Sequence, residues 1–496
     1  MEAGEQPRSE TEDRTDQACS ESFDFEQASG RFKPYHVVWI WLFLAWMFCY
    51  IDRSITGPVV SWMIDNEIGF MQNAPMPHAL GGVIGGMFFA GYMLTQFPAG
   101  YLGDRYGRKV MIVISTAWAS VTTFLSGLTR SLNTFVAMRV LTGLGEGAYY
   151  SNDRALVSVV TPESKKGLGM GVVFVGLALG LTLATVVTPY MIDFAARTWG
   201  SESAWSFPFL VFSIPTMLVA VGVWKFVRRP TGDRQEYLPA LARLSVYSVV
   251  FLAIIMATYL VTVTAGLDSL SQAVAVVAIA IALIAIIYRS LGKKSAKVLK
   301  DRDLLLMYVS AIPILYTLWF FGFWALLVVS EASKMGISGA AIYVGFFGVA
   351  NGIGYPLGGK ICDRAVKSGF GRKKAYVLMC VLDSLAVAAL AVYVGTGGSD
   401  VLILGILVFC IGVPFAAMQT VHMTLTSDLA PKGQAAQTFG MWNLVGEIGA
   451  VISPVLSGTL RDLTGGWTLA IGLDAILLVA SAGLVLGIRR QGSRIS

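Results

Sequence analysis

The sequence predicts an all-α integral membrane protein with 14 transmembrane helices, and three observations predict it. Hydrophobic residues make up 55% of the 496 residues and charged residues only 14%, whereas soluble domains carry about 25% charged residues. Glycine is abundant, at 53 residues, as is typical of membrane helices. The apolar residues form long runs, and the length of these runs is close to the roughly 20 residues that a helix needs to cross a bilayer. This composition excludes an ordinary cytosolic enzyme and a disordered or fibrous protein.

The predicted spans are grouped as six, two and six. The first six are 37–63, 80–102, 110–129, 133–160, 167–192 and 205–227. Two more follow at 245–265 and 270–289, and the last six are 304–330, 338–360, 375–396, 401–428, 435–459 and 467–488. We therefore expect an N-terminal six-helix bundle over 34–229, a linker with an extra helical hairpin over 230–303, and a C-terminal six-helix bundle over 304–490.

The first 33 residues are predicted to be a disordered, acidic, cytoplasmic tail. They hold nine acids and four bases and lack an apolar core. A signal peptide needs such a core, so this segment does not resemble one. Its low hydrophobicity and high charge are typical of a solvated, disordered segment.

The basic residues predict the orientation of the chain. With the N-terminus in the cytoplasm, the outer loops hold only four bases, Arg130, Arg197, Lys334 and Arg461. This asymmetry follows the positive-inside rule and predicts that both termini are cytoplasmic. We expect a multi-pass protein of the plasma (cell inner) membrane. The net charge of +6 then marks the inner face. The basic stretch 289–302 is interpreted as an anchor on anionic membrane lipids, and no nucleic-acid partner is expected.

A charged motif occurs twice, each time at the end of the second span of a six-span group. Its first copy contains Gly100, Asp104, Arg105, Gly107, Arg108 and Lys109, and its second contains Gly359, Asp363, Arg364, Gly371, Arg372, Lys373 and Lys374. Both copies fall on the cytoplasmic side, which indicates two related halves in the same orientation. An acid at a helix end beside these bases can form a latch that opens and closes during gating. The alternative is a loop that only anchors the chain.

This repeated Gly-x-x-x-Asp-Arg pattern, with its Gly-Arg-Lys ending, resembles the signature loop of the major facilitator superfamily. The resemblance covers about residues 34–490. It implies the major facilitator fold of two six-helix bundles, a central binding site between them, alternating access, and gating roles for Asp104, Arg105, Arg108, Asp363 and Arg364. The extra helical pair departs from the commonest twelve-span plan, although members with such an insertion are known. We expect the insertion to lie at the periphery.

Several ionisable residues lie inside predicted spans, where each costs about 2.5–3.5 kcal/mol to insert and so needs a functional or pairing reason. Asp52 and Arg53 lie in the first span and point about 100° apart on a helix. A permanently charged guanidinium facing a cavity is suited to bind a carboxylate. An acid in a dry site can carry a proton. The alternative is that both are structural and pair with other buried groups.

The fourth span carries Arg139 and Glu146, seven residues apart, which places them on the same side of a helix. Glu146 can carry a proton for the same reason as Asp52. Three glycines, Gly143, Gly145 and Gly147, permit a close approach by a neighbouring helix. Asp153 and Arg154 come later in the span, and a terminal ion pair is the favoured interpretation.

Polar and aromatic residues in other spans are more ambiguous. Tyr92 lies four residues before Gln96, so it can donate a hydrogen bond into a cavity or simply pack. The aromatic run 316–324 is interpreted equally well as a ligand-facing wall and as packing. His422 is more typical of packing than of proton transfer. Asn443 and Glu447 lie one turn apart in the eleventh span of the paired halves, and Glu447 bears the same insertion cost as Glu146.

These positions resemble those of the anion:cation symporter family, which includes bacterial sugar-acid carriers. The matching residues are Tyr50, Asp52, Arg53, Tyr92, Gln96, Pro98, Gly100, Arg139, Gly143, Glu146, Gly147 and Asn443. The resemblance implies that Arg53 binds a substrate carboxylate, that Tyr92 and Asn443 line the same site, and that Asp52 and Glu146 couple protons. Arg139 would act on Glu146 or on the substrate. Glu447 does not match the family pattern and is assigned to proton coupling as a further acid.

The leading hypothesis is proton-coupled symport of a small organic anion, a carboxylate, by a monomer. One alternative is proton-coupled export of drug-like or lysolipid-like amphiphiles, and another is a sensor of the same fold that transports nothing. An enzyme is not expected, because no nucleophile–base pair or phosphate-binding loop is recognisable. No cofactor or metal is expected, because the five cysteines lack metal-ligand spacing.

Overall fold

The computed structural model describes residues 33–162, 165–228, 234–290, 298, 300–431 and 434–489. The predicted acidic tail, apart from its last residue, and most of the basic stretch 289–302 lie outside these described residues. Every secondary-structure element in the described part of the chain is a helix, as the composition predicts.

The N-terminal bundle contains the first six predicted spans. Its helices are α2 (Pro34–Ser54), α3 (Thr56–Asp65), α4 (Pro77–Tyr106), α5 (Arg108–Gly127), α6 (Leu132–Glu146), α7 (Tyr149–Val160), α8 (Lys166–Trp199), the short α9 (Ser201–Ala204) and α10 (Phe207–Phe226), with a 3₁₀ turn, η2, at Gly69–Met71. Two spans consist of two helices in tandem. The first comprises α2 and α3, and the fourth comprises α6 and α7, which are separated directly after Glu146.

The remaining helices form the insertion and the C-terminal bundle. The insertion is α11 (Tyr237–Thr264) and α12 (Ser269–Ser290). The C-terminal bundle is α14 (Arg302–Ser333), α15 (Gly336–Lys367), α16 (Arg372–Gly395), α17 (Val401–Leu429), α18 (Ala435–Thr464) and α19 (Thr468–Leu486).

Thirteen segments of the described chain are long and apolar enough to cross a membrane. The fourth predicted span is the one missing from this number. Its two helices, α6 and α7, have 15 and 12 residues, so each is shorter than a bilayer-spanning helix requires. Together they cover the predicted range 133–160, so each of the fourteen predicted spans corresponds to helix in the structure.

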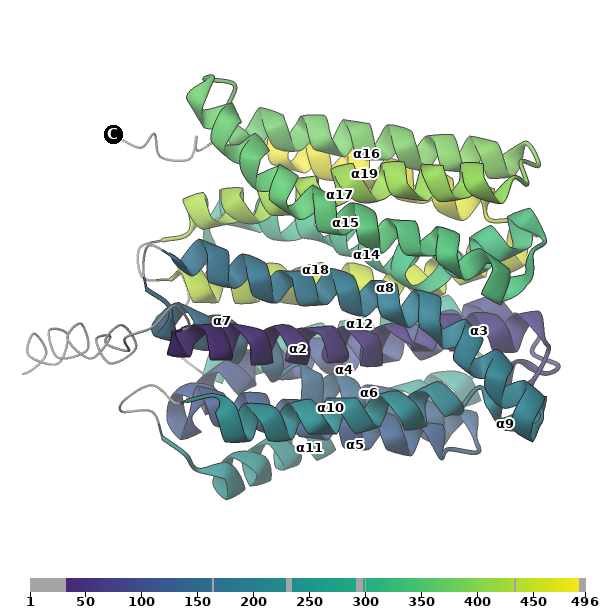
Figure 1. The fold of residues 1–496 in the computed structure, drawn as a ribbon, viewed down its shortest axis with the longest axis horizontal. Helices are drawn as coiled ribbons and strands as arrows, with labels where there is room; N and C mark the ends of the chain where they lie inside the picture. Colours follow the sequence, from purple (N-terminus) through teal and green to yellow (C-terminus); the bar gives the residue numbers. More distant parts are fainter. Residues whose placement is uncertain are drawn as a thin grey trace, which may run out of the picture.

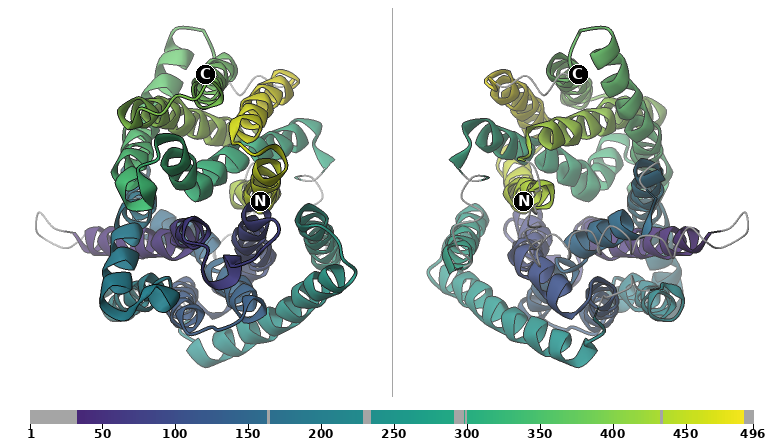
Figure 2. Two further views of the ribbon diagram at one scale, coloured as in Figure 1. Left: turned by 90° about the vertical axis from the view of Figure 1, so that its right-hand side faces the viewer. Right: turned by 90° about the vertical axis from the view of Figure 1, so that its left-hand side faces the viewer.

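The two bundles lie side by side with their helices roughly parallel to one long axis (Figure 1). They meet along two helix pairs, α4 against α18 and α8 against α15. The start of α2 and the end of the described chain lie at the same end of the molecule, at the left of Figure 1. We call this the terminal end of the molecule and the opposite one the far end. Seen along the long axis, the two bundles form one continuous cluster of helices (Figure 2).

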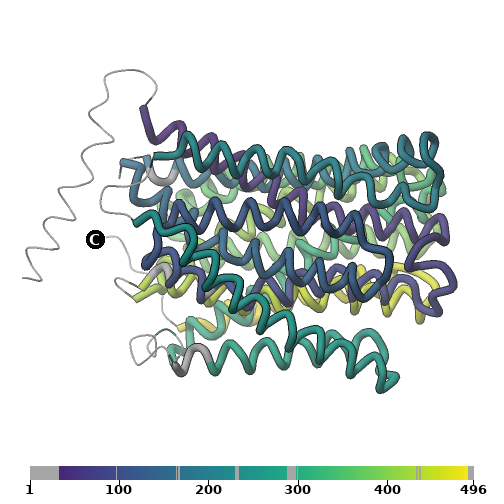
Figure 3. The backbone as a smooth tube through the Cα atoms, turned by 90° about the horizontal axis from the view of Figure 1, so that it is seen from below, coloured from purple at the N-terminus to yellow at the C-terminus, as the bar shows by residue number. Residues whose placement is uncertain are grey.

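The inserted hairpin spans the seam between the bundles at the periphery. Helix α11 crosses the N-terminal bundle obliquely (Figure 3) and packs against α4, α5 and α6. Helix α12 packs against α4 of one bundle and α18 of the other. The hairpin therefore contacts the N-terminal bundle through both helices and the C-terminal bundle through α12.

Candidate functional site

A buried ion pair joins the first and fourth spans of the N-terminal bundle. Arg53 on α2 donates from Nε and Nη2 to the same carboxylate oxygen of Glu146 on α6, at 3.1 and 2.8 Å. Both side chains are buried. The second carboxylate oxygen of Glu146 has no hydrogen-bond partner. The guanidinium predicted to bind an anion thus already holds a carboxylate, supplied by the protein itself.

Glycines at the end of α6 and directly after it allow a close approach to α4, as the sequence predicts for a neighbouring helix. A Cβ atom added to Gly143 would lie 2.0 Å from the carbonyl oxygen of Phe88, and one added to Gly147 would lie 2.3 Å from that of Tyr92. Both carbonyls belong to α4. Real Cβ atoms do not come so close, so only glycine permits this approach of α6 to α4. The helix then ends at Glu146, beside the face of α4 that carries Tyr92.

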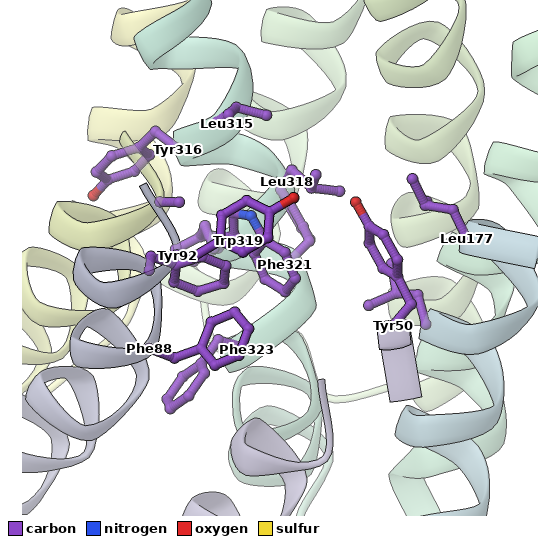
Figure 4. Close-up of a cluster of buried hydrophobic side chains, with 14 of the residues drawn as sticks. Tyr50, Phe88, Tyr92, Leu177, Leu315, Tyr316, Leu318, Trp319, Phe321 and Phe323 are labelled. Atoms are coloured by element: carbon purple, nitrogen blue, oxygen red, sulfur yellow. The ribbon is translucent and has the colours of Figure 1, made fainter. Parts of the chain in front are cut away.

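Aromatic rings surround the Arg53 guanidinium. Its central carbon lies 4.4 Å from the ring centroid of Tyr50 and 4.7 Å from that of Tyr92, with Phe88 at 5.7 Å. The ring of Trp319 on α14 stacks on that of Tyr50, with 6.2 Å between the ring centroids. The C-terminal bundle therefore contacts this aromatic group. Figure 4 shows these rings gathered where α2, α4 and α14 meet. Trp319, from the predicted aromatic wall, therefore stacks on a ring that faces the guanidinium, and cation–π contact holds the guanidinium against Tyr50 and Tyr92.

Asp52 and Arg139 lie on the other side of α2, inside the N-terminal bundle. One carboxylate oxygen of Asp52 accepts from Thr216 at 3.4 Å, and the other has no partner. Arg139 donates to the backbone carbonyl of Asp52 at 3.4 Å and to the hydroxyls of Ser126 and Thr142 at 2.5 and 3.1 Å. Arg139 thus bonds to the backbone beside the ion pair, and its hydrogen bonds do not include the Glu146 carboxylate.

Asn443 and Glu447 on α18 contribute polar groups of the C-terminal bundle near Arg53. The amide nitrogen of Asn443 donates to Gln96 on α4 at 2.9 Å and to Glu447 at 3.3 Å. The second oxygen of Glu447 is buried without a partner, and its carboxylate interacts electrostatically with Arg53. The structure therefore gathers Arg53, Glu146, Tyr92, Asn443 and Glu447 at the junction of the two bundles.

Two other ionisable groups of the spans are placed away from this junction. His422 lies within the C-terminal bundle, where its ring nitrogens contact Ser310 and Trp442, each at 2.8 Å. This arrangement satisfies a neutral imidazole and agrees with a packing role. Nε of Arg154 lies 3.4 Å from a carboxylate oxygen of Asp153. This is the ion pair that the sequence predicts near the end of the fourth span.

The two copies of the charged motif differ at the terminal end. In the first copy, Arg108 pairs with Asp104 at 3.2 Å; Asp104 is exposed and Arg108 is partly exposed. In the second copy, the salt bridge is formed by Arg372 with Asp428 of α17, at 2.6 Å. Asp363 and Arg364 are exposed on the last turns of α15.

A cluster that the sequence reasoning missed closes the far end. His78 on α4 contacts Asp462 on α18 at 2.6 Å and Glu331 on α14 at 3.3 Å. On the other helix pair, Ser338 of α15 donates to Asp193 of α8 at 2.6 Å. Each contact joins one bundle to the other. These contacts join both helix pairs of the seam near the far end, so the two bundles are closed together there.

Comparisons with known proteins match this architecture. The family model for the Major Facilitator Superfamily matches residues 42–347 and 329–494. The D-galactonate transporter of Escherichia coli O6:H1 is 23% identical over 456 residues, which are 90% of this chain and 94% of that protein. The probable galactarate/D-glucarate transporter of Bacillus subtilis strain 168 is 24% identical over 489 residues, covering 94% and 95% of the two chains.

A solved structure agrees on the fold. The crystal structure of a D-xylose-proton symporter superposes with a TM-score of 0.67 at 15% identity, over 93% of this chain and 99% of that one. The family model covers nearly all of the two bundles, and the full-length relatives are named as transporters, not as enzymes. This chain, a multi-pass helical membrane protein, belongs to the major facilitator superfamily of transporters.

Proposed function

We propose that this protein imports a small organic carboxylate together with protons, by alternating access between its two bundles. The observation that carries the proposal is the Arg53–Glu146 pair. A guanidinium at the junction of the bundles holds a carboxylate from another helix, within a cage of aromatic rings. A substrate carboxylate can take the same place, because Arg recognises carboxylates through paired N–H donors.

Proton coupling follows from competition for Arg53. An ionised Glu146 occupies the guanidinium, whereas a protonated Glu146 is a weaker acceptor and releases it. The proton and the anion therefore bind together. Asp52 and Glu447 are the further proton carriers, since each has a buried carboxylate oxygen without a partner. Tyr92 and Asn443 line the anion-binding site. Arg139 holds the backbone of α2 in place through its hydrogen bond to the carbonyl of Asp52.

The relatives support an organic anion as substrate. Two that extend over nine-tenths of this chain are named for galactonate and for galactarate and glucarate, which are all carboxylates at neutral pH. In the proposed orientation the terminal end, with both termini and the charged motif, is cytoplasmic, and the protein lies in the plasma (cell inner) membrane. Asp104, Arg105, Arg108, Asp363 and Arg364 would then gate the cytoplasmic side.

The decisive test is uptake of labelled carboxylates into proteoliposomes, with and without an inward proton gradient. Uphill accumulation of one acid that depends on the gradient is the expected result. Arg53→Lys, which keeps the charge and loses the planar fork, should abolish it. Accumulation that ignores the proton gradient would contradict symport, and accumulation of no acid would contradict the proposed function as a whole.

A second candidate function is proton-coupled export of an aromatic amphiphile. The observation that favours it is the density of rings around Arg53, to which Trp319 contributes from the opposite bundle. Rings stack well on planar apolar bodies. The same vesicles, loaded with amphiphiles and given the opposite gradient, separate the two candidates.

A further inference from the structure

We infer that the far end carries a second proton-binding site, formed by His78, Glu331 and Asp462, whose bound proton ties the two bundles together there. This site is remote from Arg53 and goes beyond the proposed function. It does not depend on which substrate is carried. Its ligand is the proton itself, and its effect is closure of the far end.

With both neighbouring carboxylates ionised, the geometry of His78 requires two ring protons. Nδ1 lies 2.6 Å from an oxygen of Asp462, and Nε2 lies 3.3 Å from an oxygen of Glu331. Ionised carboxylates only accept hydrogen bonds, and a neutral imidazole has a single N–H. Both contacts are hydrogen bonds only when the ring is an imidazolium. In the neutral ring, one nitrogen lone pair would face a carboxylate oxygen.

The neighbouring groups hold the two acids in place and account for their other bonds. The backbone N–H of Ala79 donates to the second oxygen of Asp462 at 2.8 Å. Arg461 on α18 donates to Glu331 at 2.9 and 3.0 Å, and Trp467 beside α19 donates to the same oxygen at 3.0 Å. Both acids are therefore ordered acceptors whether or not His78 is protonated.

The charges around His78 favour a cation. Glu331, Asp462 and Asp65 at the end of α3, which interacts electrostatically with Glu331, supply three negative charges. Arg461 supplies one positive charge. An imidazolium reduces the remaining excess from two negative charges to one. Opposite charges at this separation attract strongly in a partly buried site, so the closed far end binds a proton more tightly than an open one would.

The bonds of His78 cross the seam between the bundles. His78 belongs to the N-terminal bundle, whereas Asp462 and Glu331 belong to the C-terminal bundle. A Cβ atom added to Gly458 would lie 2.2 Å from the backbone oxygen of His78, so the two backbones already touch here. Loss of the ring proton replaces one cross-bundle bond by a repulsion and weakens closure.

Protons reach this site from the far end. The side chain of Glu331 is 27% exposed, whereas those of His78 and Asp462 are 9% and 8% exposed. In the proposed orientation the far end faces the outside. An acidic exterior would then promote closure of the outer side before the cytoplasmic side opens. This last step alone rests on the proposed topology.

The test measures closure directly, without substrate. Spin labels on Arg130→Cys and Ser399→Cys, with the native cysteines replaced, report the separation of the bundles at two exposed far-end turns. Electron–electron distance measurements in lipid nanodiscs would follow the open-to-closed ratio between about pH 5.5 and about pH 8.5, which brackets histidine titration. For the unsubstituted His78 we expect this ratio to rise about tenfold across the range, because a charge-assisted bond is lost.

Two substitutions at His78 and one control make the result decisive. His78→Gln should be more open and insensitive to pH, and His78→Arg, a permanent cation, should be closed throughout the range. His36→Gln is the matched control, since His36 lies at the terminal end and contacts Lys33. A pH response that is absent from the parent protein, or that persists in His78→Arg, would overturn the inference even if His78→Gln does not fold.

Discussion

Replacing Glu146 by Gln should tighten anion binding and remove the part of its pH dependence that arises from Glu146. Glu146 competes with the substrate carboxylate for Arg53 and receives two hydrogen bonds, at 3.1 and 2.8 Å. Hydrogen bonds to a charged group contribute about 1.5–3 kcal/mol and neutral ones about 0.5–1.5 kcal/mol. Because both bonds go to one oxygen, we take the free-energy cost of displacing the ionised Glu146 from Arg53 as about 2 kcal/mol in total. That difference corresponds to about thirtyfold tighter binding at a pH where Glu146 is ionised.

The pH profile supplies the sharper readout. As Glu146 ionises, the dissociation constant of the parent protein should rise with pH and level off about thirtyfold higher, because the anion then has to compete with the Glu146 carboxylate for Arg53. The profile of Glu146→Gln should lack this rise, and any pH dependence that remains then belongs to Asp52 and Glu447. Binding of a transported carboxylate can be followed by titration calorimetry on purified protein at several pH values. Neutralising the same residue should also abolish uphill accumulation and preserve exchange.

A matched control separates this effect from a general loss of buried charge. Asp153→Asn removes another buried carboxylate of the N-terminal bundle, which bonds to Trp46 and Arg154 and not to Arg53. It should leave the slope of the pH profile unchanged. If Glu146→Gln binds the anion more weakly than the parent, or keeps the parent's slope, then Glu146 does not compete for Arg53 and the reasoning fails.

Three further predictions address other parts of the machinery. Arg53→Lys should weaken carboxylate binding at least about tenfold, since the ammonium lacks the paired donors; calorimetry showing unchanged affinity would remove Arg53 from the site. Glu447→Gln should lower by one the number of protons moved per anion, measured as the reversal potential in proteoliposomes, and an unchanged ratio would exclude it as a carrier. Asp104→Asn breaks the 3.2 Å bridge to Arg108 and should slow turnover while binding is kept, whereas turnover at the parent rate would rule out the latch.

The fold could be predicted almost completely from the sequence, because the physics of spanning a bilayer is local. A run of about 20 apolar residues has few alternatives to a helix in lipid. The exceptions are the first span, which consists of α2 and α3, and the fourth span, where the sequence predicts one helix and the structure has α6 and α7. The break in the fourth span falls directly after Glu146, in a run with glycines at 143, 145 and 147. These glycines signal close packing, and the same lack of side chains weakens the helix.

The site was predictable as a set of residues but not as a set of partners. The high cost of a charge in lipid singles out Arg53, Arg139, Glu146 and Glu447 one at a time. Pairing depends on which helices touch, and Arg53 lies 93 residues from Glu146. The seven-residue spacing suggests that Arg139 accompanies Glu146, yet Arg139 bonds to the carbonyl of Asp52. The polar cluster around His78 carried no such signal, because charges near the end of a span cost little.

Both proton sites favour uptake in the same direction under the proposed topology. A proton on Glu146 frees Arg53 for an incoming anion, and a proton on His78 ties α4 to α14 and α18 at the outer side. A high external proton concentration therefore promotes loading and then closure, which are the two steps that must precede release to the cytoplasm. On the cytoplasmic side a low proton concentration reverses the first effect, because Glu146 ionises and competes for Arg53, and the anion is expelled. A gradient acting at two separate sites can thus bias the cycle even where either proton alone shifts its equilibrium by only a modest factor.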